Sequence, residues 1–401
     1  MKKIVFILGN YKNGGMAMRA TNLANEFAKN GYFVDILVTG EIGNYYTALQ
    51  KGVAIVDSKR YICSPKSEKK FLLEKKNLKY RIRFLKFIQN VIKFIPSINM
   101  KTKYRIKILR STSNIRKYFL DNPNSVIIPF GMSYVAKVYA NCRGIECNII
   151  YAEKNAPQVE FENSAIDKEF YLYIFKRISA MIAQTKDTAD FYKKYVNNVY
   201  VINNPVKPLN LEPYEGIRRK TVVNFCRMSS QKRLDVLIDA FKLFHDDYTD
   251  YDLEIYGNTV NNIEEEYKKE INQKIIDLDL SDCAKILPPA ADVHKKIIDV
   301  AMFVSSSDFE GLSNSMIEAM AIGLPCICTD CLGGGTREVM VDQQNGLIVP
   351  MNDVTALYKA MCEFANNTEL SKSCSYNAAR IKEKLASDVI ANKWLKIIES
   401  C

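Results

Sequence analysis

Apolar, strand-like runs alternate with helical patterns twice along this chain, and this alternation constrains the fold more than any other feature of the sequence. The first forty residues contain the run KIVFIL, a loop with two glycines, a helical pattern over 16–30 and a second apolar run, FVDILV. A strand–helix–strand unit of this kind places its two strands parallel in one sheet. The same alternation continues through the first half of the chain and starts again with TVVNFC at residue 221.

Two successive runs of this kind indicate two doubly wound α/β domains. At 401 residues the chain is long enough for two domains of ordinary size, each with its own core. Residues 206–219 are polar, contain prolines and show no periodicity, which is typical of a linker. We therefore predict a Rossmann-like domain over 1–205 and a second one over 220–385, facing each other across a cleft.

Cysteine usage and apolar runs limit the classes of protein that the chain can belong to. The eleven cysteines have no paired spacing, which favours reduced thiols in a cytoplasm over a disulfide framework. Cys326, Cys328 and Cys331 are close together, but the chain has only two histidines and the strand pattern PCICT suits core packing, so we expect no metal. KIVFIL is expected to be a buried strand and not a signal peptide. No run of 18 apolar residues predicts a helix that spans a membrane.

Positive charge is concentrated in residues 66–117, which contain 17 Lys and Arg but only two Glu. The net charge of the whole chain is +11. Within this segment RFLKFIQNVIKFIP has a helical pattern that Pro96 ends. A helix there places apolar side chains on one face (Phe84, Leu85, Ile88, Val91, Ile92 and Ile95) and polar ones on the other (Lys86, Gln89, Asn90 and Lys93). It can be a domain helix with a solvated basic back, or a face that docks on an anionic membrane or a lipid diphosphate. No recognised nucleic-acid motif accompanies the charge, so nucleic acid is not the expected partner.

Ligands of doubly wound sheets bind at the carboxyl ends of the strands, so the strand-to-helix loops are where a site is expected. The first such loop, GNYKNGG, has neither the GxGxxG spacing of a dinucleotide site nor the Lys-Ser/Thr ending of a Walker loop, which disfavours a dehydrogenase and an NTPase. Gly14 and Gly15 precede a helix and can offer backbone N–H groups to an anion, or form an ordinary turn.

Two cations, Arg227 and Lys232, stand five residues apart in the loop after the first strand of the second domain, just ahead of a helix. A guanidinium makes bidentate contacts and an ammonium supplies a point charge, and together they suit a diphosphate. The same pair also fits solvated surface charge. The loop sequence alone leaves both interpretations open.

The stretch SSSDFEGLSNSMIEAM at 305–320 places Glu310 and Glu318 on either side of a helix start. In a structural interpretation Ser315 is the N-cap and Glu318 reaches back to complete a capping box. In a functional one the positive end of the helix faces a phosphate, Gly311 lets the backbone approach closely and the carboxylates accept hydrogen bonds from sugar hydroxyls. The residues themselves do not decide between the two.

The segment FEGLSNSMIEAMAIGLPCICTD resembles the E-x(7)-E region of retaining glycosyltransferases of family 4, also called group 1, which have the GT-B fold. The resemblance continues in GGGTREVMVDQQNGLIVP, in CRMSSQK, in the opening glycine loop and helix, in YAEKNAP and in VINNPV. These motifs cover nearly the whole chain in the family's order. The resemblance is weakest over residues 41–120.

The resemblance implies a role for each matched position. Glu310, Arg227 and Lys232 become the candidate catalytic residues, with Glu310 on the donor sugar and the two cations on the diphosphate. Glu318 is expected on the ribose hydroxyls. The remaining donor-side candidates are Gly311, Leu312, Ser313, Asn314, Ser315, Tyr256, Gly257, Pro288 and Val293, and the acceptor-side candidates are Gly14, Gly15, Glu153, Lys154 and Asn155. Several branches of the family use an N-domain histidine near the acceptor, whereas this chain has no histidine before His245.

By this resemblance the chain transfers a hexose or N-acetylhexosamine, with retention, from a nucleotide-diphosphate sugar to a glycan acceptor. UDP is the expected nucleotide, no metal is expected, and charge stabilisation of the leaving diphosphate is the main catalytic effect. Glu310 and Glu318 are not expected to form an acid–base pair of the glycosidase kind. The last helical segment, 386–401, is expected to pack back on the first domain.

The acceptor implied is an oligosaccharide on polyprenyl diphosphate, in capsule, O-antigen or exopolysaccharide synthesis. The expected location is cytoplasmic, with peripheral attachment to the inner face of the plasma membrane through the basic segment 66–117. A GT-B enzyme with another acceptor (a protein, a teichoic acid or a small molecule), a phosphorylase and an inactive scaffold remain alternatives.

Overall fold

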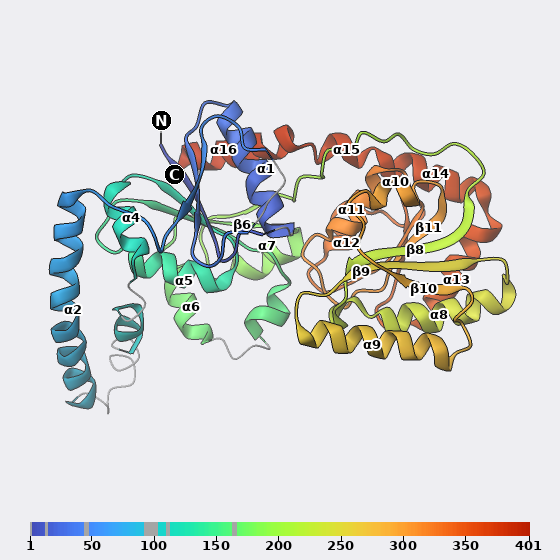
Figure 1. Ribbon diagram of the computed structural model, residues 1–401, viewed down its shortest axis with the longest axis horizontal. Coiled ribbons are helices and arrows are strands. Elements are labelled where there is room, and N and C mark those ends of the chain that lie inside the picture. The colour runs from blue at the N-terminus through green and yellow to red at the C-terminus, as the bar shows by residue number, and fades with distance from the viewer. Residues whose placement is uncertain (1, 13–14, 44–47, 92–102, 110–112, 163–166) are drawn as a thin grey trace.

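Two parallel sheets, each with helices on both faces, lie side by side in the computed structural model of the protein (Figure 1). The structure describes residues 2–12, 15–43, 48–91, 103–109, 113–162 and 167–401. The two Rossmann-like α/β domains predicted from the alternation are confirmed.

The N-terminal sheet has seven parallel strands in the order β3-β2-β1-β4-β5-β6-β7. Its central strands are apolar without alternation, because helices cover both faces of the sheet. The bounds are β1 (Ile4–Leu8), β2 (Val34–Val38), β3 (Val53–Asp57), β4 (Val126–Pro129), β5 (Asn148–Ala152), β6 (Ala180–Ala183) and β7 (Val199–Val201). The edge strand β3 was not predicted, and its residues are only partly buried.

Helices connect these strands. They are α1 (Gly15–Lys29), α2 (Pro65–Val91), α4 (Ile115–Asp121), α5 (Met132–Asn141), α6 (Lys168–Phe175) and α7 (Lys186–Tyr192), and residues 103–109 are also helical. The side chain of Thr185 accepts a hydrogen bond from the Thr188 N–H and so caps α7. Gly15, expected in a binding loop, is the first residue of α1, whereas Gly14 lies outside the described residues.

The C-terminal sheet has six parallel strands in the order β10-β9-β8-β11-β12-β13. This is the Rossmann order, whose topological switch point lies between the first and fourth strands, here β8 and β11. The bounds are β8 (Arg219–Arg227), β9 (Asp252–Asn258), β10 (Ala284–Leu287), β11 (Val300–Ser305), β12 (Cys326–Thr329) and β13 (Leu347–Val349).

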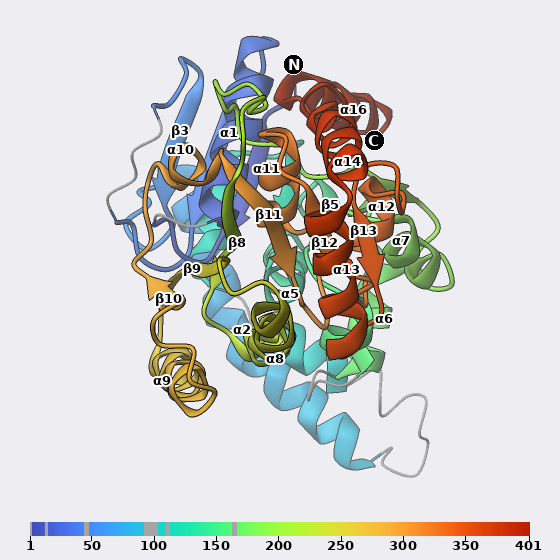
Figure 2. The ribbon, with the colours of Figure 1, turned by 90° about the vertical axis from the view of Figure 1, so that its right-hand side faces the viewer.

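The helices of this domain pack on both sides of its sheet. Seen from the end of the molecule, α8 and α13 lie side by side (Figure 2), and they contact each other. The bounds are α8 (Leu234–Asp247), α9 (Asn262–Asp277), α10 (Val293–Ile297), α11 (Asn314–Ala321), α12 (Gly335–Val339), α13 (Val354–Asn366), α14 (Thr368–Ala379), α15 (Ile381–Lys384) and α16 (Ser387–Ser400).

The last helix, α16, returns to the N-terminal domain and packs against α1. Trp394 on this helix is 2% exposed, and Glu399 accepts a hydrogen bond from the Tyr32 hydroxyl at 2.6 Å. The side-chain amide of Asn148 donates to the Cys401 carbonyl at 2.7 Å. The chain therefore passes between the two domains twice.

Helix α2 differs from the prediction for the basic segment. It begins at Pro65, well before the predicted start, and the predicted apolar residues Ile92 and Ile95 lie outside the described residues. Phe71 on α2 is buried against the domain, and Phe84 follows 13 positions later, which places it about 140° around the helix. Phe84 is consequently exposed, which disagrees with the packed-helix interpretation of this face and agrees with the docking interpretation.

Candidate active site

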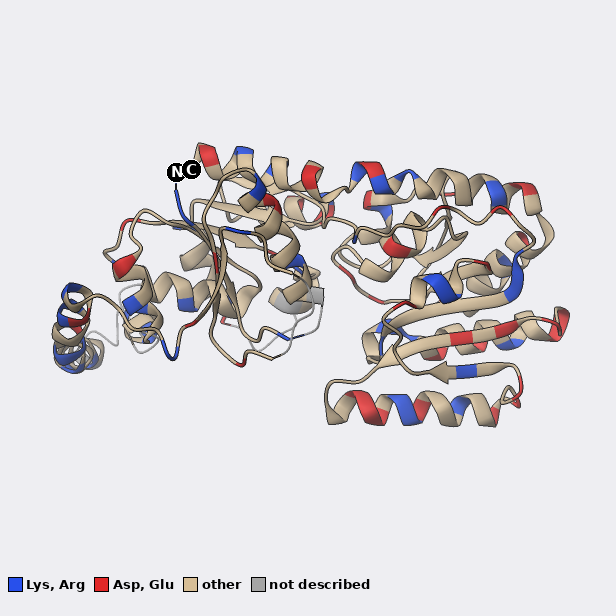
Figure 3. Cartoon of the chain, turned by 45° about the horizontal axis from the view of Figure 1, so that its top comes forward, with Lys and Arg blue, Asp and Glu red and all other residues tan. Residues whose placement is uncertain are grey.

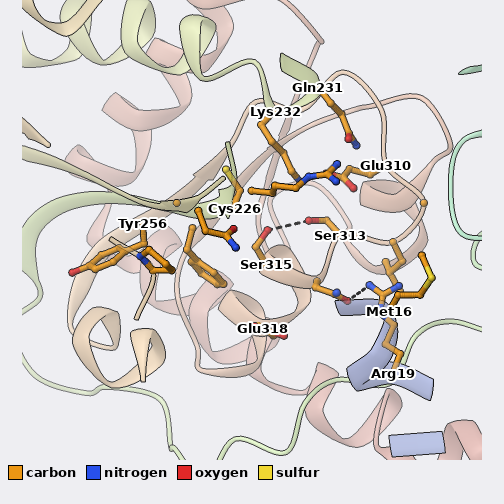
Figure 4. Close-up of a pocket in the computed structure, with 18 of the residues that line it drawn as sticks. Met16, Arg19, Cys226, Gln231, Lys232, Tyr256, Glu310, Ser313, Ser315 and Glu318 are labelled. Atoms are coloured by element: carbon orange, nitrogen blue, oxygen red, sulfur yellow. Dashed lines mark hydrogen bonds and ion pairs between the residues drawn. The ribbon is translucent and has the colours of Figure 1, made fainter. Parts of the chain in front are cut away.

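A cavity of about 510 Å³ lies between the domains, where loops from the carboxyl ends of strands in both sheets meet (Figure 4). The N-terminal domain contributes residues of α1 and of the loops after β4 and β5. The C-terminal domain contributes the ends of β8 and β9, the loop after β10, and the loop and helix after β11. The lining residues are Met16, Arg19, Phe130, Lys154, Asn155, Phe225, Cys226, Arg227, Gln231, Lys232, Tyr256, Gly257, Asn258, Pro289, Ala290, Val293, Gly311, Leu312, Asn314, Glu310, Ser313, Ser315 and Glu318.

Glu310 and Lys232 form an ion pair on one side of this cavity (Figure 4). Ser307 Oγ donates to the same carboxylate oxygen at 3.2 Å. Burial alone would lower the pKa of Lys232, but the Glu310 carboxylate more than offsets this, and the pKa is raised. Glu310, the residue expected at the donor sugar, thus directly contacts Lys232, one of the two cations expected at the diphosphate.

Glu318 does not take part in a capping box. The N-cap of α11 is Ser313, two residues before the predicted Ser315, and its side chain makes no capping hydrogen bond; its Oγ lies 3.2 Å from Ser315 Oγ. Glu318 Oε2 lies instead 2.8 Å from Nε2 of His294 on α10. The capping prediction is therefore wrong, because Glu318 has a side-chain partner at the cavity wall.

Arg227 ends β8 and lies at the cavity beside the loop that carries Lys232. Its Nε is 3.4 Å from Glu264 Oε1, and its side chain is half-exposed. Lys232 ends a short 3-10 turn, and Arg233 then begins α8 from the left-handed region, with φ of 45°. Arg227 and Lys232 both line the cavity.

Arg19 brings a third cation into the cavity, from α1 of the N-terminal domain (Figure 4). Its guanidinium contacts the side chain of Asn314 at the start of α11. Burial lowers the pKa of Arg19 to about 10, and the carboxylates of Glu318 and Glu310 act in the opposite direction. A buried cation of this kind is costly unless an anion compensates it.

Lys154 brings a fourth cation, from the loop after β5. Its Nζ lies 4.3 Å from the centroid of the Phe130 ring, a cation–π contact. Burial lowers the pKa of Lys154 to about 7, the positive charge of Arg19 adds to this, and Glu153 opposes it. The positive charge of this lysine is therefore less favourable than that of an exposed lysine.

Glu153 points away from the cavity into the domain core. It accepts hydrogen bonds from the hydroxyls of Tyr151 and Tyr192, at 2.9 and 2.7 Å, and from the backbone N–H of Lys154 at 2.7 Å. Glu153 therefore supports the backbone at Lys154 and Asn155. It does not line the cavity.

The structure gathers most of the predicted residues at one site. Among the predicted residues whose surroundings the structure describes, Glu153 and Pro288 do not line the cavity, and in the loop after β10 the neighbouring Pro289 lines it instead of the exposed Pro288. Within the described ranges, no group of three or more His, Cys, Asp and Glu side chains is placed to hold a metal ion.

Sequence reasoning missed Arg19 and His294. Arg19 stands four residues after Gly15, on the helix that follows the glycine loop, and a cation one turn into that helix was a signal that could have found it. His294 was considered only as a metal ligand, since its pairing with Glu318 depends on the contact between α10 and α11.

Part of the chain that lines this cavity matches a known protein family. Residues 219–367, which contain β8 to α13, match the model of the family described as glycosyl transferases group 1. The chain carries a group 1 glycosyltransferase domain. Glu310, Glu318, Arg227 and Lys232 all fall within the matched part of this glycosyltransferase domain.

The relatives of this glycosyltransferase domain include two curated bacterial enzymes. The poly(ribitol-phosphate) alpha-N-acetylglucosaminyltransferase of Staphylococcus aureus is 27% identical over 246 residues, 60% of this chain and 48% of that protein. The N-acetylgalactosamine-N,N'-diacetylbacillosaminyl-diphospho-undecaprenol 4-alpha-N-acetylgalactosaminyltransferase of Campylobacter jejuni is 23% identical over 322 residues, 77% of this chain and 82% of that protein. For three curated relatives the chain spans about half of the relative's length, namely 55%, 48% and 45%.

The fold of the whole chain also has solved counterparts. The structure of Alr3699/HepE from Anabaena, in complex with UDP and glucose, superposes with a TM-score of 0.73 at 16% identity and covers 100% of both chains. At that identity the likeness shows the fold, and the GT-B fold implied by the sequence motifs is confirmed.

Proposed function

We propose that this protein transfers a sugar from a nucleoside-diphosphate sugar, with UDP as the nucleotide, to a glycan acceptor. The observation that carries the proposal is the meeting of four cations and two carboxylates around one cavity at the switch points of both sheets. The cations are Arg19, Lys154, Arg227 and Lys232, and the carboxylates are Glu310 and Glu318.

The cations suit the departing nucleoside diphosphate. Negative charge grows on its bridging oxygen as the glycosidic bond breaks, and preorganised cations in a cavity shielded from water stabilise such charge most effectively. Lys232 and Arg227 approach from the nucleotide-side domain, and Arg19 approaches from the opposite domain. A metal-independent reaction follows from this proposal, since side chains supply the positive charge.

The two carboxylates are suited to accept hydrogen bonds from the hydroxyl groups of the donor. Glu310 is ion-paired to Lys232 and Glu318 is paired to His294, so each carboxylate is held in place as a hydrogen-bond acceptor. We place Glu310 at the donor sugar and Glu318 at the ribose. Neither serves as acid or base in this scheme, which is consistent with retention of anomeric configuration by front-face attack.

The proposed acceptor is a glycan on a polyprenyl diphosphate at the inner face of a plasma membrane. The Campylobacter relative, whose name contains a diphospho-undecaprenol, supports a lipid-linked acceptor. The Staphylococcus relative, whose name specifies poly(ribitol-phosphate), makes a phosphate-bearing polymer the second candidate.

Helix α2 supports the membrane part of the proposal. Leu73, Tyr80, Phe84 and Phe87 are each at least 60% exposed, and their spacing of seven, four and three places them on one face. Lysines and arginines are spread along the same helix, which stands at the outer edge of the N-terminal domain (Figure 3). Aromatic side chains flanked by cations suit the interface of an anionic bilayer. Within the part of the chain that the structure describes, no helix is long and apolar enough to cross a bilayer.

A panel of nucleotide sugars, read by release of nucleoside diphosphate, tests the transfer reaction. We expect release with one or a few UDP-sugars and its loss in Lys232→Met. Formation of sugar phosphate from inorganic phosphate would identify a phosphorylase instead. No release with any donor, in the presence of lipid-linked and polyol-phosphate acceptors, would contradict the proposal.

Flotation with vesicles tests the membrane attachment. We expect binding at low salt to vesicles that contain phosphatidylglycerol, and its loss in a Phe84→Ser, Phe87→Ser double variant. Ile217→Ser is the matched control, because Ile217 is exposed and lies in the linker before β8, far from α2 along the chain. Equal flotation of all three proteins would show that α2 is not the attachment surface.

A further inference from the structure

The donor-side loop after β11 is held by a side chain of the opposite domain. The backbone N–H of Leu312 donates to Gln184 Oε1 at 2.8 Å, although the two residues belong to different domains. Gln184 follows β6 and is 3% exposed, and Leu312 is 2% exposed. This hydrogen bond is therefore buried, where an unsatisfied partner is costly.

A second residue fixes the orientation of Gln184. Its Nε2 donates to Asn204 Oδ1 at 3.0 Å, and Asn204 Nδ2 lies 3.4 Å from the Leu312 carbonyl oxygen. Gln184 and Asn204 thus contact the N–H and the carbonyl of the same residue. We name these two side chains the amide clasp.

Gly311 shows how closely the clasp holds the loop. A Cβ atom at position 311 would lie 2.5 Å from Gln184 Oε1 and 2.7 Å from the Lys154 carbonyl oxygen, closer than side chains tolerate. Glycine at this position therefore serves the approach of the opposite domain. The clasp also occupies the N–H of Leu312, a residue that the family resemblance placed among the donor-side candidates.

We propose that Gln184 and Asn204 are positioning residues that give the donor-side loop its binding shape only while the two domains are apposed. Glu310 and Ser313, which line the cavity, flank the clasped residues Gly311 and Leu312. When the domains separate, the loop loses both contacts and Glu310 loses its fixed place. Donor affinity is in this way coupled to domain closure, an inference that rests on the proposed transferase function.

Gln184→Met tests the clasp, because methionine keeps the length of the side chain and removes both polar groups. We expect the donor KM to rise about tenfold, with kcat changed less, since a buried N–H is left without its acceptor. Hydrogen exchange of a peptide that spans residues 309–316 should accelerate by a similar factor.

Asp187→Asn is the matched control. Asp187 accepts a hydrogen bond from Arg337 at 2.7 Å across the same domain boundary, but at an exposed position away from Leu312. We expect its donor KM and its loop exchange to stay at wild-type values. If Gln184→Met fails to fold, Asn204→Ala makes the same test at smaller amplitude, because Gln184 then loses the oxygen that holds its amide.

The outcomes separate this inference from the proposed function. Wild-type exchange and donor KM in Gln184→Met would overturn the clasp while leaving the transferase intact. If the wild-type protein turns over no nucleotide sugar, the proposed function fails, and loop exchange in Gln184→Met still decides whether the clasp exists.

Discussion

The Nε2 atom of His294 lies 2.8 Å from Oε2 of Glu318, and both side chains are almost completely removed from solvent. The ring of Phe225 meets the imidazole edge-on, with ring centroids 5.6 Å apart, and limits its rotation. Glu318 is thus held at the cavity by a neighbouring helix and not by the backbone of its own helix.

This pairing predicts that Glu318 contributes to binding more than to helix stability. Glu318→Ala should weaken UDP binding by about tenfold or more, the loss expected when a charged hydrogen-bond partner is removed, and should change the melting temperature little. Calorimetric titration with UDP and thermal unfolding measure the two effects. His294→Gln is the companion variant, since its amide can still donate to Glu318 and should retain most of the affinity. A large fall in melting temperature with unchanged UDP affinity would contradict the binding role.

The ion pair of Lys232 and Glu310 predicts non-additive stability. Lys232→Met leaves the Glu310 carboxylate largely buried without its cation, and we expect a loss of about 2–4 kcal/mol in the free energy of unfolding. The double variant Lys232→Met, Glu310→Gln should be more stable than Lys232→Met alone, because no uncompensated charge remains. Denaturant unfolding of the two single variants and the double variant gives the coupling energy, and additive losses would show that the pair does not interact. Activity should be lost in all three.

The position of Arg19 predicts that its replacement has opposite effects on stability and on activity. Its guanidinium is buried, so Arg19→Met should leave the melting temperature unchanged or raise it, while nucleoside-diphosphate release should fall by at least about tenfold. Arg60→Met is the control, because Arg60 is an exposed arginine of the same domain and its loss should alter neither quantity. Normal turnover in Arg19→Met would remove Arg19 from the site.

The burial of Lys154 predicts that its contribution to the stability of the protein depends on pH. Its pKa is lowered to about 7 in the folded protein by burial, whereas a lysine in the unfolded chain has a pKa of about 10.4. Between these values the unfolded state binds more protons, so this residue's contribution to stability rises with pH and is lost as the pH falls toward 7. The melting temperature of Lys154→Met should therefore exceed that of the wild type most at pH 7 and approach it near pH 10. A difference that is independent of pH would contradict a lowered pKa.

The fold could be predicted because the information is local and repeated. Runs such as KIVFIL and TVVNFC, each followed by a loop and an amphipathic helix, leave a doubly wound sheet as the natural arrangement for each half. The motif residues Glu310, Glu318, Arg227 and Lys232 could be placed near one another because loops at the carboxyl ends of adjacent strands converge.

The features that the sequence did not predict depend on contacts between elements far apart in the chain. Ser315 and Glu318 have the spacing of a capping box, but His294 competes for the carboxylate and the helix starts two residues earlier than predicted, after Ser313. Arg19 acquires its role only when α1 faces α11 across the domain boundary. Whether the face with Phe84 packs on the domain or is exposed stayed open, because the start of α2, and therefore which face it buries, was not evident from the sequence.

The double passage of the chain between the domains determines how the cavity can open. The two connections run alongside each other, since the backbone N–H of Val206 donates to the Leu385 carbonyl at 2.9 Å and Lys382 Nζ donates to the Leu211 carbonyl at 3.1 Å. We expect two connections joined in this way to favour rotation of one domain about them and to resist shear and twist between the domains. If the domains rotate about these two connections, the cavity opens most on the side remote from them, and closure brings Gln184 back to the Leu312 N–H.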